Sequence, residues 1–176
     1  SFIGDTVRFT SLRPHRIRFA GRTEQFLSAF GEHLRDVDVE AAVVVACEQT
    51  GARIAEFHVA PIYPSADSLR RGHQWFVELD LPPPDPDAFV RALDAALQRR
   101  NVDYEEHRRQ DADLPLPELW PVPQGTFYAA MRRLGRVGGQ YKVPHVQNDR
   151  RFAELLLEVA GADGPAEGTA RRDVRR

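Results

Sequence analysis

The sequence predicts an α+β protein in which short N-terminal hairpins lead into a ferredoxin-like split βαβ sandwich with an antiparallel sheet. After the hairpins, the expected elements follow the order helix, strand, strand, helix, strand, helix, which is close to the split βαβ pattern. The chain has 176 residues, enough for one domain with a hydrophobic core. Such a fold does not by itself define a function.

The N-terminal part predicts two hairpins. Residues 6–9 and 17–20 are runs rich in β-branched and aromatic residues, and the loop between them contains Pro14. A second, smaller hairpin is expected within residues 26–34, turning at Gly31. Because the sequence opens on strand-like residues without a methionine, we expect it to be a piece of a longer protein.

The next segment predicts a helix over residues 37–48. Asp36 is a suitable N-cap, and Gly51 is a suitable C-terminal stop. We expect four apolar residues of this helix to face the sheet: Val37, Ala41, Val44 and Val45.

Two strands and a second helix follow. Residues 53–62 and 73–81 alternate loosely between apolar and polar positions, which predicts strands. Asp85 then caps a helix that has Pro86 at its first position. Its apolar stripe comprises Phe89, Leu93, Ala96 and Leu97.

The C-terminal half predicts shorter elements. The second helix either continues or restarts through residues 104–109, whose charges predict a solvated face with i,i+4 ion pairs. Residues 116–122 contain prolines and predict an edge strand. Further helices are expected from Thr126 to Leu134 and near residues 149–159, and Trp75 and Trp120 are expected to pack in the core or at the sheet edge.

Composition excludes several classes of protein. The formal net charge of −2 argues against a nucleic-acid-binding domain. Cys47 is the only cysteine, so no internal disulfide can form and a reducing cytoplasm is expected. No apolar run approaches the roughly 20 residues that span a bilayer, so we expect no membrane partner. The preference for arginine over lysine suggests a GC-rich coding sequence and a bacterial origin.

Familiar catalytic motifs are missing from the sequence. It contains no P-loop, no Gly-x-Gly-x-x-Gly fingerprint and no nucleophile elbow with a Ser-His-acid order. Four histidines lack the spacing of metal ligands, so no metal site is predicted: His58, His73, His107 and His145. Any phosphate chemistry would therefore need residues from outside this chain.

The sequence contains one lysine, Lys142, beside paired glycines and before Pro144. An ammonium group is a compact point charge that suits a phosphate or carboxylate oxygen, whereas a guanidinium needs a wider, forked site. Glycine allows the backbone to approach a ligand closely. On these residues alone, an anion-binding lysine and a solvated surface lysine remain alternatives. Asp5 and Arg22 also have two interpretations each. They could bind a sugar or an anion, or they could be ordinary turn and surface residues.

Taken together, these motifs resemble one family. Residues 4–9 (GDTVRF) and 18–23 (RFAGRT) look like the linker motif of adenylate-forming enzymes. Residues 125–127 (GTF) and 139–144 (GQYKVP) resemble the closing motifs of the auxin-responsive Gretchen Hagen three family of acyl-acid amido synthetases. The helix at 93–97 and Tyr104 also sit where that family has a helix and a tyrosine, and the resemblance extends to about Val159.

The resemblance implies a reaction in two steps. ATP and a carboxylic acid give an acyl-adenylate and pyrophosphate, and the amine of an amino acid then attacks to give an amide and AMP. Asp5 would hold the ribose hydroxyls, Arg22 would assist at the nucleotide, and Lys142 would reach the α-phosphate and the carboxylate. The hinge would lie at Thr23 and Glu24. The lysine would be supported by its neighbours Gly139, Gln140 and Tyr141.

The resemblance also implies a division of the chain. Residues 1–22 would be the end of a large N-terminal domain with linker strands, 23–160 a C-terminal lid domain, and 161–176 a disordered tail. ATP would be the cofactor, with Mg supplied through the nucleotide and the missing domain, and the partners would be the protein's own N-terminal adenylation domain, a small acid and an amine. This fragment alone is not expected to turn over.

The alternative is a stand-alone ferredoxin-like module that binds a small ligand or regulates without catalysis. The sequence departs from the family at His145, where the family often has arginine.

Overall fold

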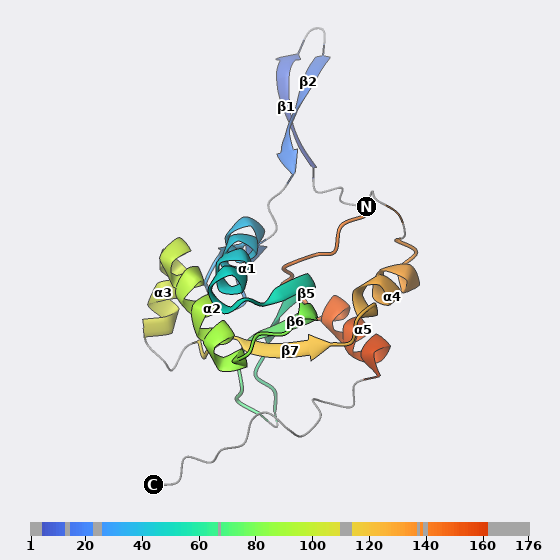
Figure 1. Cartoon of the computed structure of the whole chain (residues 1–176). Coiled ribbons are helices and arrows are strands. Elements are labelled where there is room, and N and C mark those ends of the chain that lie inside the picture. The colour runs from blue at the N-terminus through green and yellow to red at the C-terminus, as the bar shows by residue number, and fades with distance from the viewer. Residues whose placement is uncertain are drawn as a thin grey trace.

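The computed structural model describes residues 5–12, 15–22, 26–66, 68–109, 114–136, 138 and 141–161, the first two segments as backbone only. Within these residues, two small hairpins and a three-stranded sheet combine with five helices (Figure 1). This arrangement confirms the predicted α+β class and is compatible with a ferredoxin-like split βαβ fold. The predicted C-terminal tail lies outside the described residues, apart from Gly161. No helix in the described segments has the length and apolar character needed to cross a membrane.

Both predicted hairpins are present. Strands β1 (Asp5–Leu12) and β2 (His15–Arg22) pair antiparallel as a two-stranded sheet. The shorter pair is β3 (Phe26–Leu27) and β4 (Leu34–Arg35), also antiparallel. Gly31 lies in the turn between β3 and β4 with φ of +97°, a left-handed conformation that favours glycine.

The main sheet contains β5 (Arg53–Ile62), β6 (Gly72–Leu81) and β7 (Glu118–Val122), in that order. The antiparallel arrangement predicted from the sequence holds for β5 and β6. Strand β7 instead runs parallel to β6, because the helices α2 (Pro86–Arg100) and α3 (Val102–Arg109) form a crossover between them. As expected, β7 lies at the edge of this sheet.

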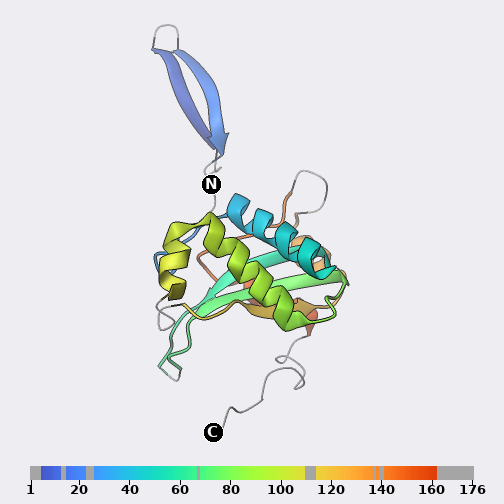
Figure 2. The same ribbon diagram turned by 60° about the vertical axis from the view of Figure 1, so that its left-hand side comes forward.

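The sheet separates two layers of helices (Figure 2). Helices α1 (Asp36–Thr50) and α2 cover one face, and α4 (Thr126–Arg133) and α5 (Arg151–Ala160) cover the other. Alternate residues of a strand point to opposite faces, so Trp75 and Val77 of β6 belong to the first cluster and Phe76 belongs to the second.

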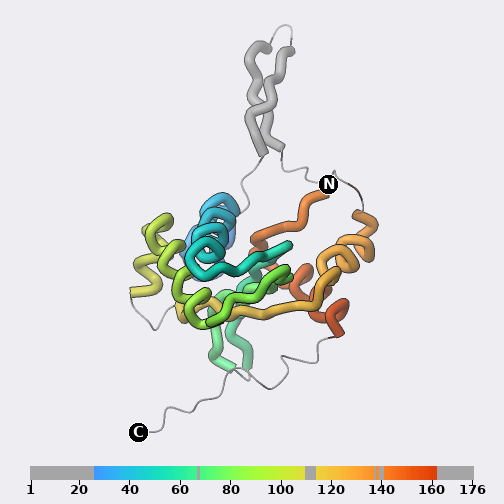
Figure 3. The backbone as a smooth tube through the Cα atoms, viewed as in Figure 1, coloured from blue at the N-terminus to red at the C-terminus, as the bar shows by residue number. Residues whose placement is uncertain are grey.

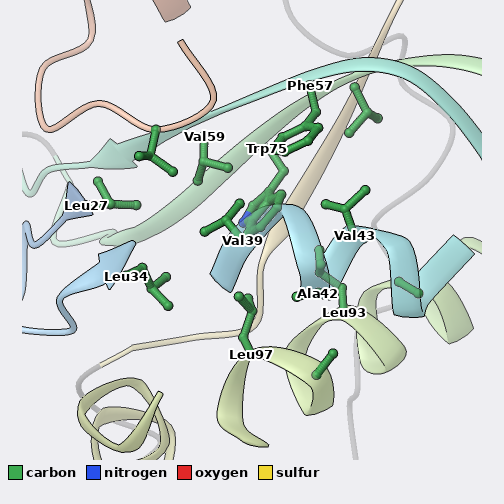
Figure 4. Close-up of a cluster of buried hydrophobic side chains, with 14 of the residues drawn as sticks. Leu27, Leu34, Val39, Ala42, Val43, Phe57, Val59, Trp75, Leu93 and Leu97 are labelled. Carbon is green, nitrogen blue, oxygen red and sulfur yellow. The ribbon is translucent and has the colours of Figure 1, made fainter. Parts of the chain in front are cut away.

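The cluster beneath α1 and α2 is the larger of the two. Trp75 lies at its centre, between Val39 and Val43 of α1, and Leu93 and Leu97 of α2 belong to the same cluster (Figure 4). Each of these buried side chains stabilises the fold by about 1.5–3 kcal/mol relative to an exposed position.

The predicted buried face of α1 is right at Val45, which packs partly buried against the cluster, and wrong at Val37 and Val44. Val37 and Val44 are 48% and 54% exposed. The buried apolar residues are instead Val39, Ala42, Val43 and Ala46. Residues 41–46 are apolar around the whole helix, so their spacing does not define one face, and α2 together with the sheet selects the buried side.

The caps of α1 agree with the prediction only in part. The N-cap position is Arg35, not Asp36, and Asp36 lies in the first turn, where Oδ1 accepts a hydrogen bond from the Val37 N–H at 2.8 Å. Gly51 ends the helix with φ of +73°, as predicted.

Helix α2 follows the prediction, and α3 agrees with one of the two alternatives but corrects the expected exposure of Tyr104. Asp85 accepts hydrogen bonds from the N–H groups of Asp87 and Ala88, and the predicted apolar stripe is buried. Helix α2 ends at Arg100, its C-cap Asn101 has an extended backbone, and α3 begins at the next residue, so α3 is a separate helix. Tyr104 is fully buried instead of solvated. The expected exposed i,i+4 pair in α3 is present, between Glu105 and Arg109.

Candidate functional site: the lysine loop

We call residues 138–144 the lysine loop; the structure describes residue 138 and residues 141–144 of it. Helix α4 ends before it at Arg133, with Leu134 as C-cap, and the N–H of Gly135 donates to the Arg132 carbonyl. Gly138 has φ of +113°, and its carbonyl accepts a hydrogen bond from the Tyr141 N–H at 3.2 Å. This turn lies directly before Lys142, and a left-handed glycine permits it without steric strain.

The exit of the lysine loop is held by strand β5. The Val59 N–H donates to the carbonyl of His145 at 2.8 Å, and the Gln147 N–H donates to the carbonyl of Val59 at 3.2 Å. Val146 therefore forms a parallel bridge with Val59. Figure 3 shows the backbone of the segment that follows the loop and of strand β5. These backbone bonds fix the path of the chain four residues after Lys142.

His58 adds a side-chain contact at the same place. Its Nδ1 lies 2.6 Å from the carbonyl oxygen of Pro144, so Nδ1 carries the hydrogen that is donated. Burial lowers the pKa of His58 to about 4, although the hydrogen bond to Pro144 opposes the shift. The ring is thus neutral near pH 7, and its Nε2 has no hydrogen-bond partner within the described part of the chain. The neutral ring of His58 thus holds Pro144, the last residue of the loop, without burying a charge beside it.

His145 holds the segment after the loop from the other side of β5. Its ring stacks on Phe57 with centroids 4.2 Å apart and an interplanar angle of 19°. Its Nδ1 lies 2.7 Å from Oε1 of Glu40 in α1, and its Nε2 lies 2.9 Å from Oε1 of Glu56 in β5. One side chain thus links the end of the lysine loop to a helix and a strand.

Lys142 itself is exposed. Its neighbour Val143 packs against the cluster beneath α4 and α5, and Tyr141 is exposed. Among the residues that the structure describes, no hydrogen bond or ion pair engages the ammonium group of Lys142. The backbone around Lys142 is therefore held while its charge remains accessible to an anionic ligand.

The motif at residues 125–127 has a structural role at the start of α4. The N–H groups of Gly125 and Phe127 donate to the two carboxylate oxygens of Glu78, at 2.8 and 3.2 Å. The Thr126 hydroxyl donates to the carbonyl of Pro123 at 2.7 Å. A helix N-terminus attracts anions, and here a carboxylate of β6 already occupies that position. The motif thus orients the helix that leads into the lysine loop.

The other predicted site residues are described only in part. Asp5 and Arg22 are register partners across the β1–β2 hairpin, so their backbones lie side by side. Their proposed contacts with a nucleotide involve side chains outside the description and stay predictions. The hinge residues Thr23 and Glu24, and the loop residues Gly139 and Gln140, lie outside the described residues.

Sequence reasoning missed a buried polar network on the α1 and α2 side. His73 Nε2 lies 2.8 Å from Oε1 of Glu32, and both side chains are almost fully buried. Asp94 accepts hydrogen bonds from the Tyr104 hydroxyl at 2.8 Å and from Arg108 Nε at 2.7 Å. The one available signal was an aspartate inside the apolar stripe of α2. Within the described segments, no group of three or more acidic, histidine or cysteine side chains could hold a metal ion.

The fold and the loop define an α+β domain that presents a single lysine on a segment fixed to its sheet. A model of the GH3 family C-terminal domain matches residues 37–151, which is well over half of the chain. The chain therefore belongs to the GH3 family, of which it contains the C-terminal domain. The resemblance inferred from the linker and lysine motifs is confirmed at the level of the family.

Solved structures agree with this assignment. One, described as "GH3.15 acyl acid amido synthetase", is 22% identical with a TM-score of 0.62, and the match covers 89% of this chain and 29% of that chain. A second, "AtGH3.15 acyl acid amido synthetase in complex with 2,4-DB", is 20% identical with the same TM-score and the same coverage of 89% and 29%. This likeness shows the fold, and the chain spans less than a third of those proteins. No curated protein matches the chain in sequence comparison.

Proposed function

We propose that this chain is the C-terminal lid of an ATP-dependent acyl-acid amido synthetase. The full-length protein would adenylate a carboxylic acid and then transfer the acyl group to an amino acid or another amine. The observation that carries this proposal is the lysine loop: in a GH3 C-terminal domain, Lys142 is exposed and unpaired among the described residues, on a backbone fixed by His58 and Val59. Such an arrangement suits a cation that meets its ligand only when a second domain supplies it.

The chemistry explains why a lysine is suited to this position. Adenylation brings a carboxylate to the α-phosphate of ATP, so negative charge concentrates where the two anions meet. A positioned ammonium group stabilises that charge most strongly in a cleft that excludes water. Closure of a lid can exclude water and complete the site in one movement. Lys142 therefore belongs at the α-phosphate and the substrate carboxylate.

The remaining roles complete the proposal. Asp5 holds the ribose hydroxyls, Arg22 assists at the nucleotide, and Thr23 and Glu24 form the hinge between residues 1–22 and the lid at 23–160. The N-terminal adenylation domain supplies the acid pocket and most of the binding of ATP and Mg. The register pairing of Asp5 with Arg22 supports a common position beside one ligand.

The test replaces Lys142 in the full-length protein. Lys142→Ala removes the cation, and we expect acid-dependent pyrophosphate release to fall on the order of 10²-fold or more. Lys142→Arg keeps the charge but places it on a planar guanidinium, which needs a wider site, so it should restore only part of the rate. The matched control is Arg133→Ala, which removes an exposed cation from α4. Pyrophosphate release unchanged in Lys142→Ala, with the circular dichroism spectrum preserved, excludes Lys142 from adenylation.

A further inference from the structure

The contacts of His145 determine its protonation state. Each ring nitrogen lies within hydrogen-bond distance of a carboxylate oxygen, one on Glu40 and one on Glu56. An ionised carboxylate only accepts hydrogen bonds, so both nitrogens must donate. A neutral imidazole has one donor, whereas the imidazolium has two. The observed geometry is therefore that of a protonated histidine between two carboxylates.

The surroundings of the ring favour the same state. The titratable groups that face it are Glu40 from α1, and Glu56 and the neutral His58 from β5; the stacked ring of Phe57 carries no charge. Burial opposes the charged form of His145, but the hydrogen bonds to Glu56 and Glu40 and their negative charges outweigh it and raise the pKa. Two carboxylates around one imidazolium leave a net negative charge, which favours retention of the proton.

The position of His145 couples this bridge to Lys142. Only Val143 and Pro144 separate the two residues, so their Cα atoms lie within about 11 Å of each other. Proline fixes its own φ and restricts the residue before it to extended conformations. The segment from Lys142 to His145 is consequently stiff, so we expect a change in the attachment of His145 to reach the lysine.

We propose that His145 is a pH-dependent positioning residue, whose protonated ring ties the lysine loop to α1 and β5 and whose deprotonation releases one of the two carboxylates. In the neutral ring one nitrogen presents a lone pair to a carboxylate, which is repulsive. The bridge to Glu40 or Glu56 then breaks, and the loop keeps its backbone bonds to β5, the packing of Val143 and the contact of Pro144 with His58. The consequence for catalysis rests on the proposed function, whereas the order of the loop does not.

The sign of the pH dependence follows from the raised pKa. A group whose pKa is higher in the folded protein than its ordinary value of 6.5 contributes its full stabilisation below that value. The contribution is lost as the pH rises through the folded pKa. The lysine loop should therefore be held below about pH 6.5 and loosen as the pH rises through the raised pKa of His145.

The experiment measures the loop and the histidine together in the full-length protein, from about pH 5.5 to about pH 9. Exchange of the His145 ring C–H, followed by mass spectrometry, gives its pKa. Amide exchange of the peptide that contains residues 141–145, corrected for the intrinsic effect of pH, gives the order of the loop. We expect protection to fall several-fold as the pH passes the measured pKa of His145.

Three variants separate the charge from the presence of a side chain. His145→Gln cannot donate from both sides, so the loop should be weakly protected at every pH. His145→Arg keeps two-sided donation and stays charged, so protection should be high and independent of pH. Glu40→Gln removes one carboxylate and should move the loss of protection to lower pH. The matched control, His33→Gln, removes an exposed histidine paired with Asp103 and should change nothing at the loop.

The proposal is overturned if protection of residues 141–145 does not change through the titration of His145, or if His145→Gln is as protected as the original protein. Pyrophosphate release provides the second readout. Its kcat should fall as the pH rises through the measured pKa of His145, and His145→Arg should abolish this fall. The two readouts can also disagree. If the protection of residues 141–145 follows the titration of His145 while kcat stays constant, the result would support the bridge and contradict the catalytic role assigned to Lys142.

Discussion

The two faces of the sheet satisfy their buried polar groups in different ways. Beneath α1 and α2, charged side chains pair with each other inside the protein, as in Glu32 with His73 and Asp94 with Arg108. Beneath α4 and α5, the buried polar residues His58 and Thr126 bind the carbonyls of Pro144 and Pro123, which belong to the loops around α4. The first face mainly joins elements to each other, and the second binds loop carbonyls; the lysine loop is held from both faces, because His145 contacts Phe57 and Glu40 on the first. The site therefore lies where polar contacts fix the backbone and leave the side chain of Lys142 free of partners among the described residues.

The largest expected effect comes from the α2 side of this comparison. Asp94→Ala removes the carboxylate that accepts hydrogen bonds from Tyr104 and from Arg108, whose side chain is only 10% exposed. We expect the free energy of unfolding to fall by about 4 kcal/mol, because breaking a buried pair costs more than the pair contributes. Urea denaturation followed by tryptophan fluorescence measures this change.

The matched control for Asp94→Ala is Asp103→Ala, which removes an exposed carboxylate from the neighbouring helix α3. It should change the free energy of unfolding by less than about 0.5 kcal/mol. Equal effects of the two variants would mean that burial of the Asp94 network contributes nothing to stability.

The second prediction concerns the smaller cluster. Leu156 of α5 is fully buried against α4 and the sheet, so Leu156→Ala should lower the free energy of unfolding by about 3 kcal/mol. The same substitution at the exposed Leu69 provides the baseline. If the second face exists to hold the loop, the amides of residues 141–145 should lose protection in Leu156→Ala and keep it in a variant of the α1 and α2 cluster that is destabilised equally, such as Leu93→Ala.

These contrasts also explain what the sequence could predict. Helix α2 was predicted correctly because its signals are local: a capping aspartate, a proline at the first position and an apolar stripe. The buried face of α1 was not, because its central residues are apolar on all sides and only packing selects among them. The direction of β7 depends on the crossover through α2 and α3, which no local pattern encodes.

The candidate site divides in the same way. Lys142 was found from its own motif and from its being the only lysine. Its supports were not found, because Glu40, Glu56 and His58 come from α1 and β5, more than 80 residues earlier in the chain. The buried partners Glu32 and His73 are likewise separated by 41 residues. Contacts between distant segments leave no periodic signal in a single sequence.

The third prediction uses pH to test the buried pair of Glu32 and His73 on the α1 and α2 side of the sheet. Burial opposes ionisation of Glu32, yet the hydrogen bond and charge of His73, with the backbone N–H of Phe30, lower the pKa of Glu32 below its ordinary value of 4.5. Its stabilising contribution is present above that value and is lost as the pH falls through the lowered pKa. Glu32→Gln should cost about 2 kcal/mol near neutral pH, and its free energy of unfolding should fall less steeply on acidification. The comparison is Glu106→Gln at an exposed position of α3, which should keep the original slope. Identical slopes in all three proteins would exclude Glu32 as the source.

The smallest expected effect lies where strand β6 contacts the start of α4. Glu78 of β6 accepts hydrogen bonds from the N–H groups of Gly125 and Phe127, so Glu78→Ala removes the cap of α4 without opening a cavity in either cluster. A lost helix cap costs about 1 kcal/mol. Asp80→Ala, two residues further along the same strand and exposed, should be neutral. Because α4 leads directly into the lysine loop, Glu78→Ala should also increase amide exchange at residues 126–136 before it affects α1 and α2. Uniform exchange across both layers would mean that the two faces unfold as one unit and that the face beneath α4 and α5 has no separate stability.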